Sequence, residues 1–299
     1  MKTICTFAAI LVMAVAPRSS HGQANVESNV VYGMYSGLAL LMDVHHPASP
    51  NGIGIVLIQG SGFHQPTSLD ADHLKDSAQR GRLASNELLE SGYTLFSINH
   101  RAAPRFRYPA AVEDAQRAVR FIRHYAARYG IDRDRVGVLG ASSGGYLASM
   151  LGVLDGDEAR DDLSAVNRES SKVQAVVAWY SPTDLVEFGP SGTHASFVGT
   201  RWSPDPESEE ARQYAEASPA YYVTRDDPPF MLMHGDADGV VPISQSENFE
   251  QKLSQAGVAV ELIRIPGGGH GERNLGVPNA PDYAGSAVAW FDRHLRDIR

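Results

Sequence analysis

The chain has 299 residues, of which 43% are hydrophobic and 20% are charged, and its formal net charge is −9. This length suggests one or two domains, and the hydrophobic content is enough for a packed core. Acidic residues outnumber basic ones by 35 to 26. This balance argues against nucleic acid or an anionic membrane as a partner, because both require clustered basic charge.

Residues 1–24 have the pattern of an export signal. Lys2 precedes the apolar run Ile4–Ala16, and the small and polar stretch Ser19–Ala24 follows. The apolar run is shorter than the roughly 20 residues that span a bilayer, which disfavours a membrane anchor or a buried helix. We therefore expect cleavage near Ala24, a secreted or periplasmic protein and no membrane span. Cleavage would remove two basic residues and no acid, leaving a charge of −11.

The only cysteine, Cys5, lies within this segment. The remaining chain would have no internal disulfide and no thiolate for catalysis or metal binding. The pair His45-His46 and the polar cluster of Asp70, Asp72 and His73 lack further matched ligands. The sequence therefore predicts neither a metal site nor a cofactor.

Apolar, β-branched runs recur along the chain with helical patterns between them. Such near-continuous runs are typical of strands that are buried on both faces. Strands that alternate with helices favour a mostly parallel sheet with helices on both faces, so we expect a single α/β domain over residues 25–299. The predicted strands are Gly54–Gln59, Thr94–Asn99, Val136–Leu139, Val173–Tyr180, Phe230–His234 and Val260–Ile265.

Other elements frame this core. The runs Val26–Tyr32 and Leu38–His45 predict a leading hairpin that turns at Ser36-Gly37 and adds antiparallel strands to one edge. Apolar residues spaced three and four apart predict a helix over Val112–Ala126, and a final helix is expected from about Tyr283 to Leu295.

Two stretches, 63–82 and 184–214, fit this alternation poorly because they are polar, contain prolines and have no strong period. Loops of that length are usually lids or binding loops. The alternative for each stretch is a surface loop without a role in binding.

The sharpest motif is Gly140-Ala141-Ser142-Ser143-Gly144, which fits the G-x-S-x-G pattern. It directly follows the predicted strand Val136–Leu139 and precedes the helical pattern Tyr146–Leu154. A nucleophile on such a strand-to-helix turn needs small neighbours because the backbone is tight there. The motif therefore predicts Ser142 as a nucleophile.

A serine hydroxyl is a weak nucleophile and needs a base that is itself held by a third group. In this kind of fold the order along the chain is Ser, then Asp or Glu, then His. Asp236 and Asp238 follow one predicted strand, and His270 follows the next within a glycine-rich loop. Both loops leave the carboxyl ends of strands, where open α/β sheets place their sites. His270 is the predicted general base, and both aspartates remain candidates to orient it.

Ester cleavage also needs donors for the developing oxyanion. The segment Gln59–Phe63 follows the first core strand, where an HGGG-type loop would lie. The backbone N–H groups of Ser61 or Gly62, together with that of Ser143, are the candidate donors, and a plain glycine-rich turn is the alternative. Phe63 and Trp179 are candidates to line a substrate pocket.

Several longer motifs accompany the predicted triad, and together they cover nearly all of residues 25–299. They are Asn99–Pro104, Tyr108–Ala115, Tyr129–Gly145, Tyr180–Leu185, Asp227–Phe230, His234–Asp238 and Gly268–Gly271. With these motifs the chain resembles the bacterial feruloyl-esterase-like and acetyl-xylan-esterase-like α/β-hydrolases, which are neighbours of the hormone-sensitive-lipase-like group. The resemblance implies that the second acid of the HG-x-x-D motif, Asp238, is catalytic. Arg101 and Asp114 match family positions and are interpreted as a structural pair.

The resemblance implies a serine carboxylic-ester hydrolase that needs no cofactor. Its substrates would be short acyl or aryl esters, either small molecules or acetyl and feruloyl groups on plant polysaccharide. One departure is that the HGGG-like loop reads Gln59-Gly60-Ser61-Gly62 here, which leaves its conformation open. A serine peptidase or arylformamidase with the same triad and a non-catalytic binding protein are the rival hypotheses. The sequence does not determine the oligomeric state.

Overall fold

A computed structural model describes residues 25–68, 72–78, 83–156, 162–271, 277 and 280–296. The predicted export signal, residues 1–24, and Asp70 of the polar cluster lie outside the described residues. Among the helices that are described, none has both the length and the apolar character to cross a membrane.

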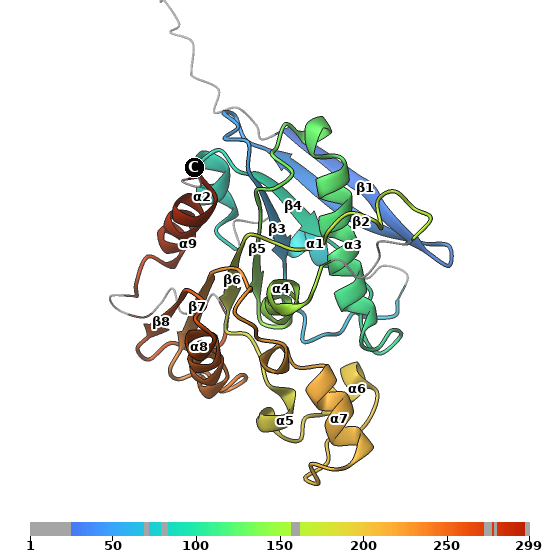
Figure 1. Ribbon diagram of the computed structural model, residues 1–299, viewed down its shortest axis with the longest axis vertical. Helices are drawn as coiled ribbons and strands as arrows, with labels where there is room; N and C mark the ends of the chain where they lie inside the picture. Colours follow the sequence, from blue (N-terminus) through green and yellow to red (C-terminus); the bar gives the residue numbers. More distant parts are fainter. Residues whose placement is uncertain are drawn as a thin grey trace, which may run out of the picture.

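Eight described strands form one sheet in the order β1-β2-β4-β3-β5-β6-β7-β8 (Figure 1). The leading hairpin of β1 (Asn25–Tyr35) and β2 (Leu38–His46) is antiparallel and turns at Ser36-Gly37, as predicted. β2 also pairs antiparallel with β4. The remaining pairings are parallel, which confirms the predicted α/β fold. They join β3 (Gly54–Ile58), β4 (Thr94–Ile98), β5 (Val136–Ala141), β6 (Ala175–Trp179), β7 (Phe230–Gly235) and β8 (Val260–Ile265).

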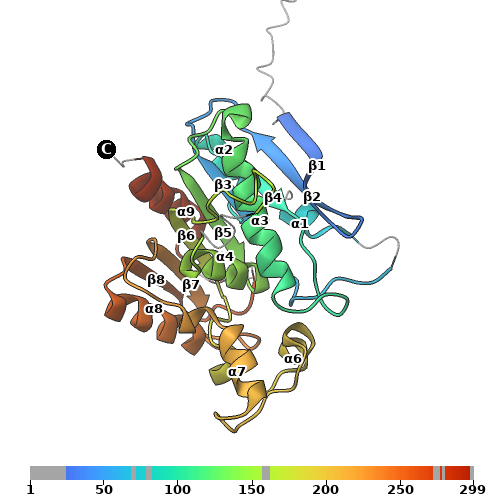
Figure 2. The same cartoon turned by 45° about the vertical axis from the view of Figure 1, so that its right-hand side comes forward.

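Helices cover both faces of this sheet, so the inner strands bury every residue. Neighbouring side chains of a strand point to opposite faces. Val56 accordingly belongs to the buried cluster that includes residues of α3 (Ala110–His124), α4 (Ser143–Val153) and α8 (Ser244–Ala256). Ile55 belongs to the cluster on the other face, which includes residues of α2 (Ser85–Glu90) and α9 (Tyr283–Phe291). The two layers of helices are visible in Figures 1 and 2. A turn of π-helix, η4 (Asp292–Arg296), extends α9 to the expected end of the last helix.

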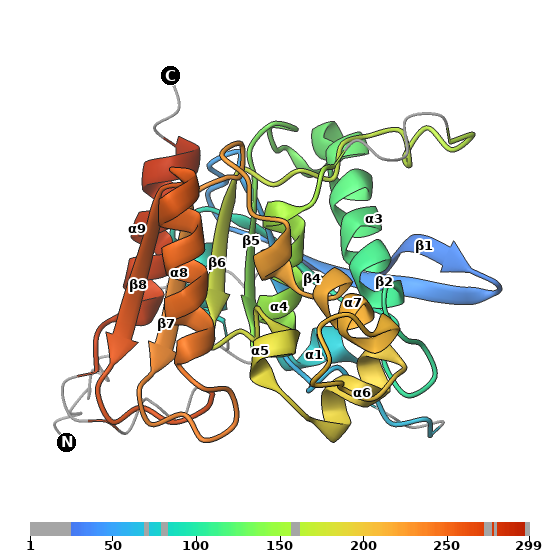
Figure 3. The ribbon, with the colours of Figure 1, turned by 60° about the horizontal axis from the view of Figure 1, so that its bottom comes forward.

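The weak pattern of the stretch 184–214 suggested an irregular loop, but the structure shows regular elements there. The stretch contains three short helices, α5 (Leu185–Phe188), α6 (Gly192–Val198) and α7 (Glu209–Glu216), which gather beyond the carboxyl ends of the strands (Figure 3). Helices of four to eight residues are too short to show an apolar period. Side-chain caps define them instead, because Asp184, Ser191 and Ser208 each accept a backbone N–H at a helix start. The stretch 63–82 likewise contains a short helix, α1 (Leu74–Ala78).

Aromatic packing fixes α6 to the body of the domain. The ring of Phe197 stacks on that of Phe63 with centroids 4.2 Å apart, and both rings meet Tyr146 of α4 edge to face. His194 lies beside this cluster with only 4% of its surface exposed, between Phe63 and Phe188. Its Nδ1 has no hydrogen-bond partner among the described residues. Burial therefore lowers the pKa of His194 to about 4.

A buried ion pair joins the end of β4 to α3. The Nε atom of Arg101 lies 2.9 and 3.0 Å from the two carboxylate oxygens of Asp114, and the backbone N–H of Arg101 donates to the same carboxylate. The guanidinium also contacts Glu113 and covers the ring of Tyr35 at 3.9 Å. The interpretation of Arg101 and Asp114 as a structural pair is confirmed.

We expect Asp114→Asn to lower the free energy of unfolding by about 3 kcal/mol, because it leaves the buried Arg101 charge poorly compensated. Glu113→Gln is the matched control, since Glu113 pairs with the same guanidinium but its side chain is 56% exposed. Its cost should stay below about 1 kcal/mol. Urea unfolding of the two variants checks this, and equal losses would contradict it.

The buried His194 predicts a loss of stability in acid. The unfolded side chain binds a proton near pH 6.5, whereas the folded one does so only near 4. His194 therefore costs no stability above pH 6.5, and its cost grows to about 3 kcal/mol as the pH falls to 4. His194→Phe removes this group and suits the aromatic surroundings. Thermal unfolding should show the variant gaining on the wild type as the pH falls from 7.5 to 4.5, and a constant difference would refute the assignment.

Candidate active site

Ser142 lies on the tight turn between β5 and α4, with φ of 53° and ψ of −124°. A residue other than glycine with a positive φ has a strained backbone, at a cost of roughly 1–3 kcal/mol. The turn depends on its glycines, because a Cβ atom on Gly140 would collide with the backbone of Gly144, and one on Gly144 would collide with Ile58. The small neighbours that the motif supplies are thus required by backbone packing. The strain presents the Ser142 side chain at the carboxyl edge of the sheet.

The structure brings Ser142, His270 and Asp238 together from three loops. His270 Nε2 lies 3.0 Å from Ser142 Oγ, and His270 Nδ1 lies 2.7 Å from Asp238 Oδ2. A carboxylate only accepts hydrogen bonds, so Nδ1 carries the proton of the neutral ring. Nε2 is then the acceptor that faces the serine hydroxyl. This arrangement can take the proton of Ser142 Oγ when that oxygen attacks.

Asp238 is held as a carboxylate by several donors. Its Oδ1 accepts the N–H groups of Val240 at 2.8 Å and Val241 at 3.0 Å. Burial by itself would raise the pKa of Asp238, but the hydrogen bonds from His234, His270 and these two N–H groups outweigh it. The pKa is therefore held well below its usual range.

Asp236, the other candidate for the acid, has a different place. Its Oδ1 accepts the N–H of Gly267 at 2.6 Å. This bond ties the loop after β7 to the loop that carries His270. Geometry thus separates the two aspartates, which the residue pattern had left open.

Two residues that were not predicted as site residues contact this triad. His234, fully buried at the end of β7, shares its Nε2 between Val241 O at 2.9 Å and Asp238 Oδ2 at 3.3 Å, and its Nδ1 lies 2.7 Å from Ser246 Oγ. Tyr180, with φ of 39°, places its ring edge to face against His270 at 4.8 Å. The four-residue spacing of the HG-x-x-D motif could have indicated His234. The position of Tyr180 directly after β6, at the start of the motif Tyr180–Leu185, could have indicated this residue.

The loop after β3 approaches the nucleophile as closely as glycine permits. A Cβ atom on Gly60 would lie 2.7 Å from Cβ of Ser142. Of the two alternatives, Ser61 and Gly62, the Ser61 N–H is already engaged, because it donates to Ser143 Oγ at 2.8 Å. The N–H groups of Gly62 and Ser143 donate to no acceptor within the described part of the chain. They remain the candidate donors.

The two aromatic side chains predicted to line a substrate pocket are both buried. Trp179 is fully buried on the face of the sheet that α9 covers, edge to face with Tyr283 at 5.2 Å. The prediction for Trp179 is wrong because strand alternation turns its side chain away from the face of α4 and α6. Phe63 is 4% exposed, and its ring packs against α6 by stacking on Phe197.

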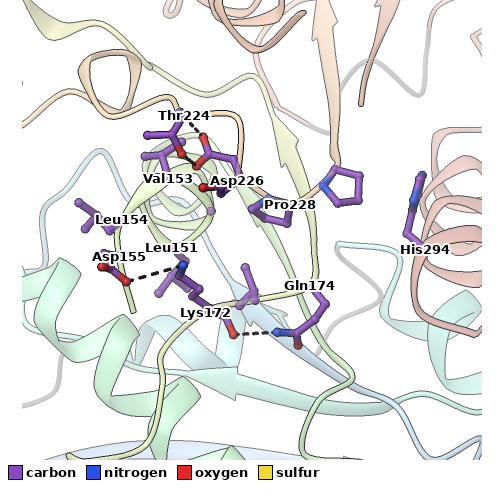
Figure 4. A pocket seen from close by; sticks show the side chains of 14 residues that line it. Leu151, Val153, Leu154, Asp155, Lys172, Gln174, Thr224, Asp226, Pro228 and His294 are labelled. Atoms are coloured by element: carbon purple, nitrogen blue, oxygen red, sulfur yellow. Dashed lines mark hydrogen bonds and ion pairs between the residues drawn. The ribbon is translucent and has the colours of Figure 1, made fainter. Parts of the chain in front are cut away.

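A cavity of about 640 Å³ lies at the opposite end of the sheet, so it is separate from the triad. Figure 4 shows Lys172 and Gln174, which precede β6, and Pro228, which precedes β7, on its wall. Among the described residues, no group of three His, Cys, Asp or Glu side chains is placed to hold a metal ion.

Comparisons with known proteins agree with this geometry. The sequence profile of the BD-FAE family matches residues 42–253. Esterase LipC of Mycobacterium tuberculosis is 30% identical over 253 residues, which are 81% of this chain, and the match spans 59% of the relative's own length.

Two solved structures have the same fold over most of their length. A truncated carbohydrate esterase from gut microbiota superposes with a TM-score of 0.76 at 27% identity, over 93% of this chain and 99% of its own. An acetyl ester-xyloside bifunctional hydrolase from Caldicellulosiruptor lactoaceticus gives a TM-score of 0.71 at 26% identity, over 85% and 88%. The chain therefore belongs to the BD-FAE family of α/β-hydrolase esterases.

Proposed function

We propose that the chain is a serine carboxylic-ester hydrolase. The observation that carries this is the continuous hydrogen-bonded chain from Asp238 through His270 to Ser142. Ser142 Oγ attacks the acyl carbon while its proton passes to His270 Nε2, and His270 then gives that proton to the departing alcohol. Water attacks the acyl-enzyme by the same route in reverse. Asp238 keeps the tautomer and stabilises the imidazolium that forms in each half.

The developing oxyanion needs donors that are already in place, since each is worth a few kcal/mol in the transition state. The N–H groups of Gly62 and Ser143 fill this role. One of them is on the loop after β3 and the other is at the start of α4. Because α4 begins at Ser143, its helix dipole also favours negative charge there.

The proposed substrates are short acyl esters on carbohydrate, with acetyl groups on a xylan-type polysaccharide first among them. Support comes from the two solved relatives, which are described as a carbohydrate esterase and an acetyl ester-xyloside hydrolase. A polymeric substrate also suits the export predicted from residues 1–24. Secretion or a periplasmic location thus remains part of the proposal.

A hydrolysis panel tests the substrate class. It contains p-nitrophenyl esters from acetyl to octanoyl, acetylated xylan, methyl ferulate, formylkynurenine and a prolyl peptide. We expect the highest kcat/KM on the acetyl ester and release of acetate from xylan. Preferential cleavage of the peptide or of formylkynurenine would instead support a peptidase or an arylformamidase.

The triad assignment predicts that Ser142→Ala and His270→Ala each remove nearly all ester turnover. The double variant should lose little more, because nucleophile and base act as one unit. The measurement is kcat/KM on p-nitrophenyl acetate, with circular dichroism to show that each variant folds. Strictly additive losses would contradict the assignment.

The two aspartates give a second prediction for the mechanism. Asp238→Asn should lower kcat by about 10³-fold or more, because the amide no longer fixes the His270 tautomer or stabilises the imidazolium. Asp236→Asn is the matched control, since it lies two residues away and only weakens the bond to Gly267. Its kcat should stay within about tenfold of the wild type. The reverse ranking would show that Asp236 is the acid.

A further inference from the structure

The loop that carries Gly62 contains a strained turn. The N–H of His64 donates to Ser61 O at 3.3 Å, and the two central residues, Gly62 and Phe63, both have φ of 63°. Two consecutive left-handed residues are typical of a type I′ turn. Glycine adopts this conformation freely, whereas a bulky side chain such as Phe63 does so only under strain. Contacts outside the turn must therefore hold it.

Two of these contacts act on the backbone that flanks Gly62. On one side the Ser61 N–H is fixed to Ser143 Oγ at 2.8 Å. On the other side the Gly62 carbonyl oxygen lies 2.8 Å from Nδ1 of His64. Along the backbone, the N–H of Gly62 comes between these two fixed groups. Since glycine has the widest backbone freedom, losing either one would leave the direction of this N–H to the long bond between Ser61 O and the His64 N–H.

The His64 ring also contacts α6, where its Nε2 lies 3.0 Å from Ser196 Oγ. A carbonyl oxygen only accepts, so Nδ1 carries the proton of the neutral ring, and Nε2 accepts the Ser196 hydroxyl. One imidazole thus links the turn to α6. The same helix packs Phe197 on the strained Phe63.

We propose that His64 is a positioning residue for ester hydrolysis. Its Nδ1–H holds the Gly62 carbonyl, and this fixes the direction of the Gly62 N–H toward the oxyanion. The proposal rests on the proposed function, because it needs Gly62 as an oxyanion donor. It also bears on the departure of this loop from the HGGG pattern, since a histidine bond restrains a turn that begins with Ser61 where the pattern has its middle glycine.

Two substitutions separate the contacts of His64. The side-chain nitrogen of Asn is as many bonds from Cα as Nδ1 of His, and the nitrogen of Gln as many as Nε2. His64→Asn therefore keeps a donor for Gly62 and loses Ser196, whereas His64→Gln does the opposite. Ser196→Ala is a further control that removes only the bond to α6.

We expect His64→Gln to lower kcat for p-nitrophenyl acetate by about tenfold or more at nearly unchanged KM, because a misdirected donor weakens the transition state and not substrate binding. His64→Asn and Ser196→Ala should stay within about threefold of the wild type. The rate of inactivation by an organophosphorus ester, whose phosphoryl oxygen occupies the same donors, should fall in parallel with kcat. Thermal midpoints of all variants are measured alongside.

Equal kcat values for the Asn and Gln variants would overturn the proposal. It would also be overturned if the Gln variant lost activity through a higher KM, or if its loss of activity matched a fall in its thermal midpoint. The outcome that defeats the proposed function is different. In that case the wild type itself shows no ester turnover that depends on Ser142, and both proposals fall together.

Discussion

The structure depends on one close approach of backbone to backbone, where the turn between β5 and α4 meets the loop after β3. Gly60 lies against Ser142, and Gly144 lies against the end of β3. No side chain fits in either place, so these glycines fix the separation of nucleophile and loop. The strain at Ser142 is stored there, and the packed sheet on one side and the buried α4 on the other maintain it. The nucleophile and the two loops that carry the candidate oxyanion donors take their positions from this contact.

Near this contact, the charge of Asp238 is stabilised by the hydrogen bonds that its two carboxylate oxygens accept. Asp238 receives two histidines on one carboxylate oxygen, His270 at 2.7 Å and His234 at 3.3 Å, and two backbone N–H groups on the other. A carboxylate with so many donors stays ionised although its side chain is fully buried. The buried charge is therefore stable before any substrate arrives, and little reorganisation is needed when the imidazolium forms.

Much of this could be predicted from the residues, for physical reasons that differ between elements. The strands were visible because both faces of each are buried, so their runs are apolar without interruption. Ser142 and His270 were visible because both lie among glycines, in the tight turn after β5 and in the loop after β8. The choice of Asp238 over Asp236 needed a family resemblance, since both follow the same strand and only their contacts differ.

Other features depend on three-dimensional neighbours that no local pattern records. Whether the Ser61 N–H is available depends on Ser143, which is 82 residues away. The burial of Trp179 under α9 depends on which face of β6 its position selects. The helices α5, α6 and α7 are held by caps and by ring contacts with distant residues, so their own residues show no period.

These caps lie within the segment from Asp184 to Glu216, which also bonds to the body of the domain through Gln245, Tyr108 and His64. Each of its helices has a side-chain cap at its start. α6 meets the body of the domain through the rings of Phe63 and Tyr146 and through hydrogen bonds with His64 and Tyr108. The catalytic chain of hydrogen bonds contains none of its residues. Substitutions within this segment therefore remove no member of the hydrogen-bonded triad.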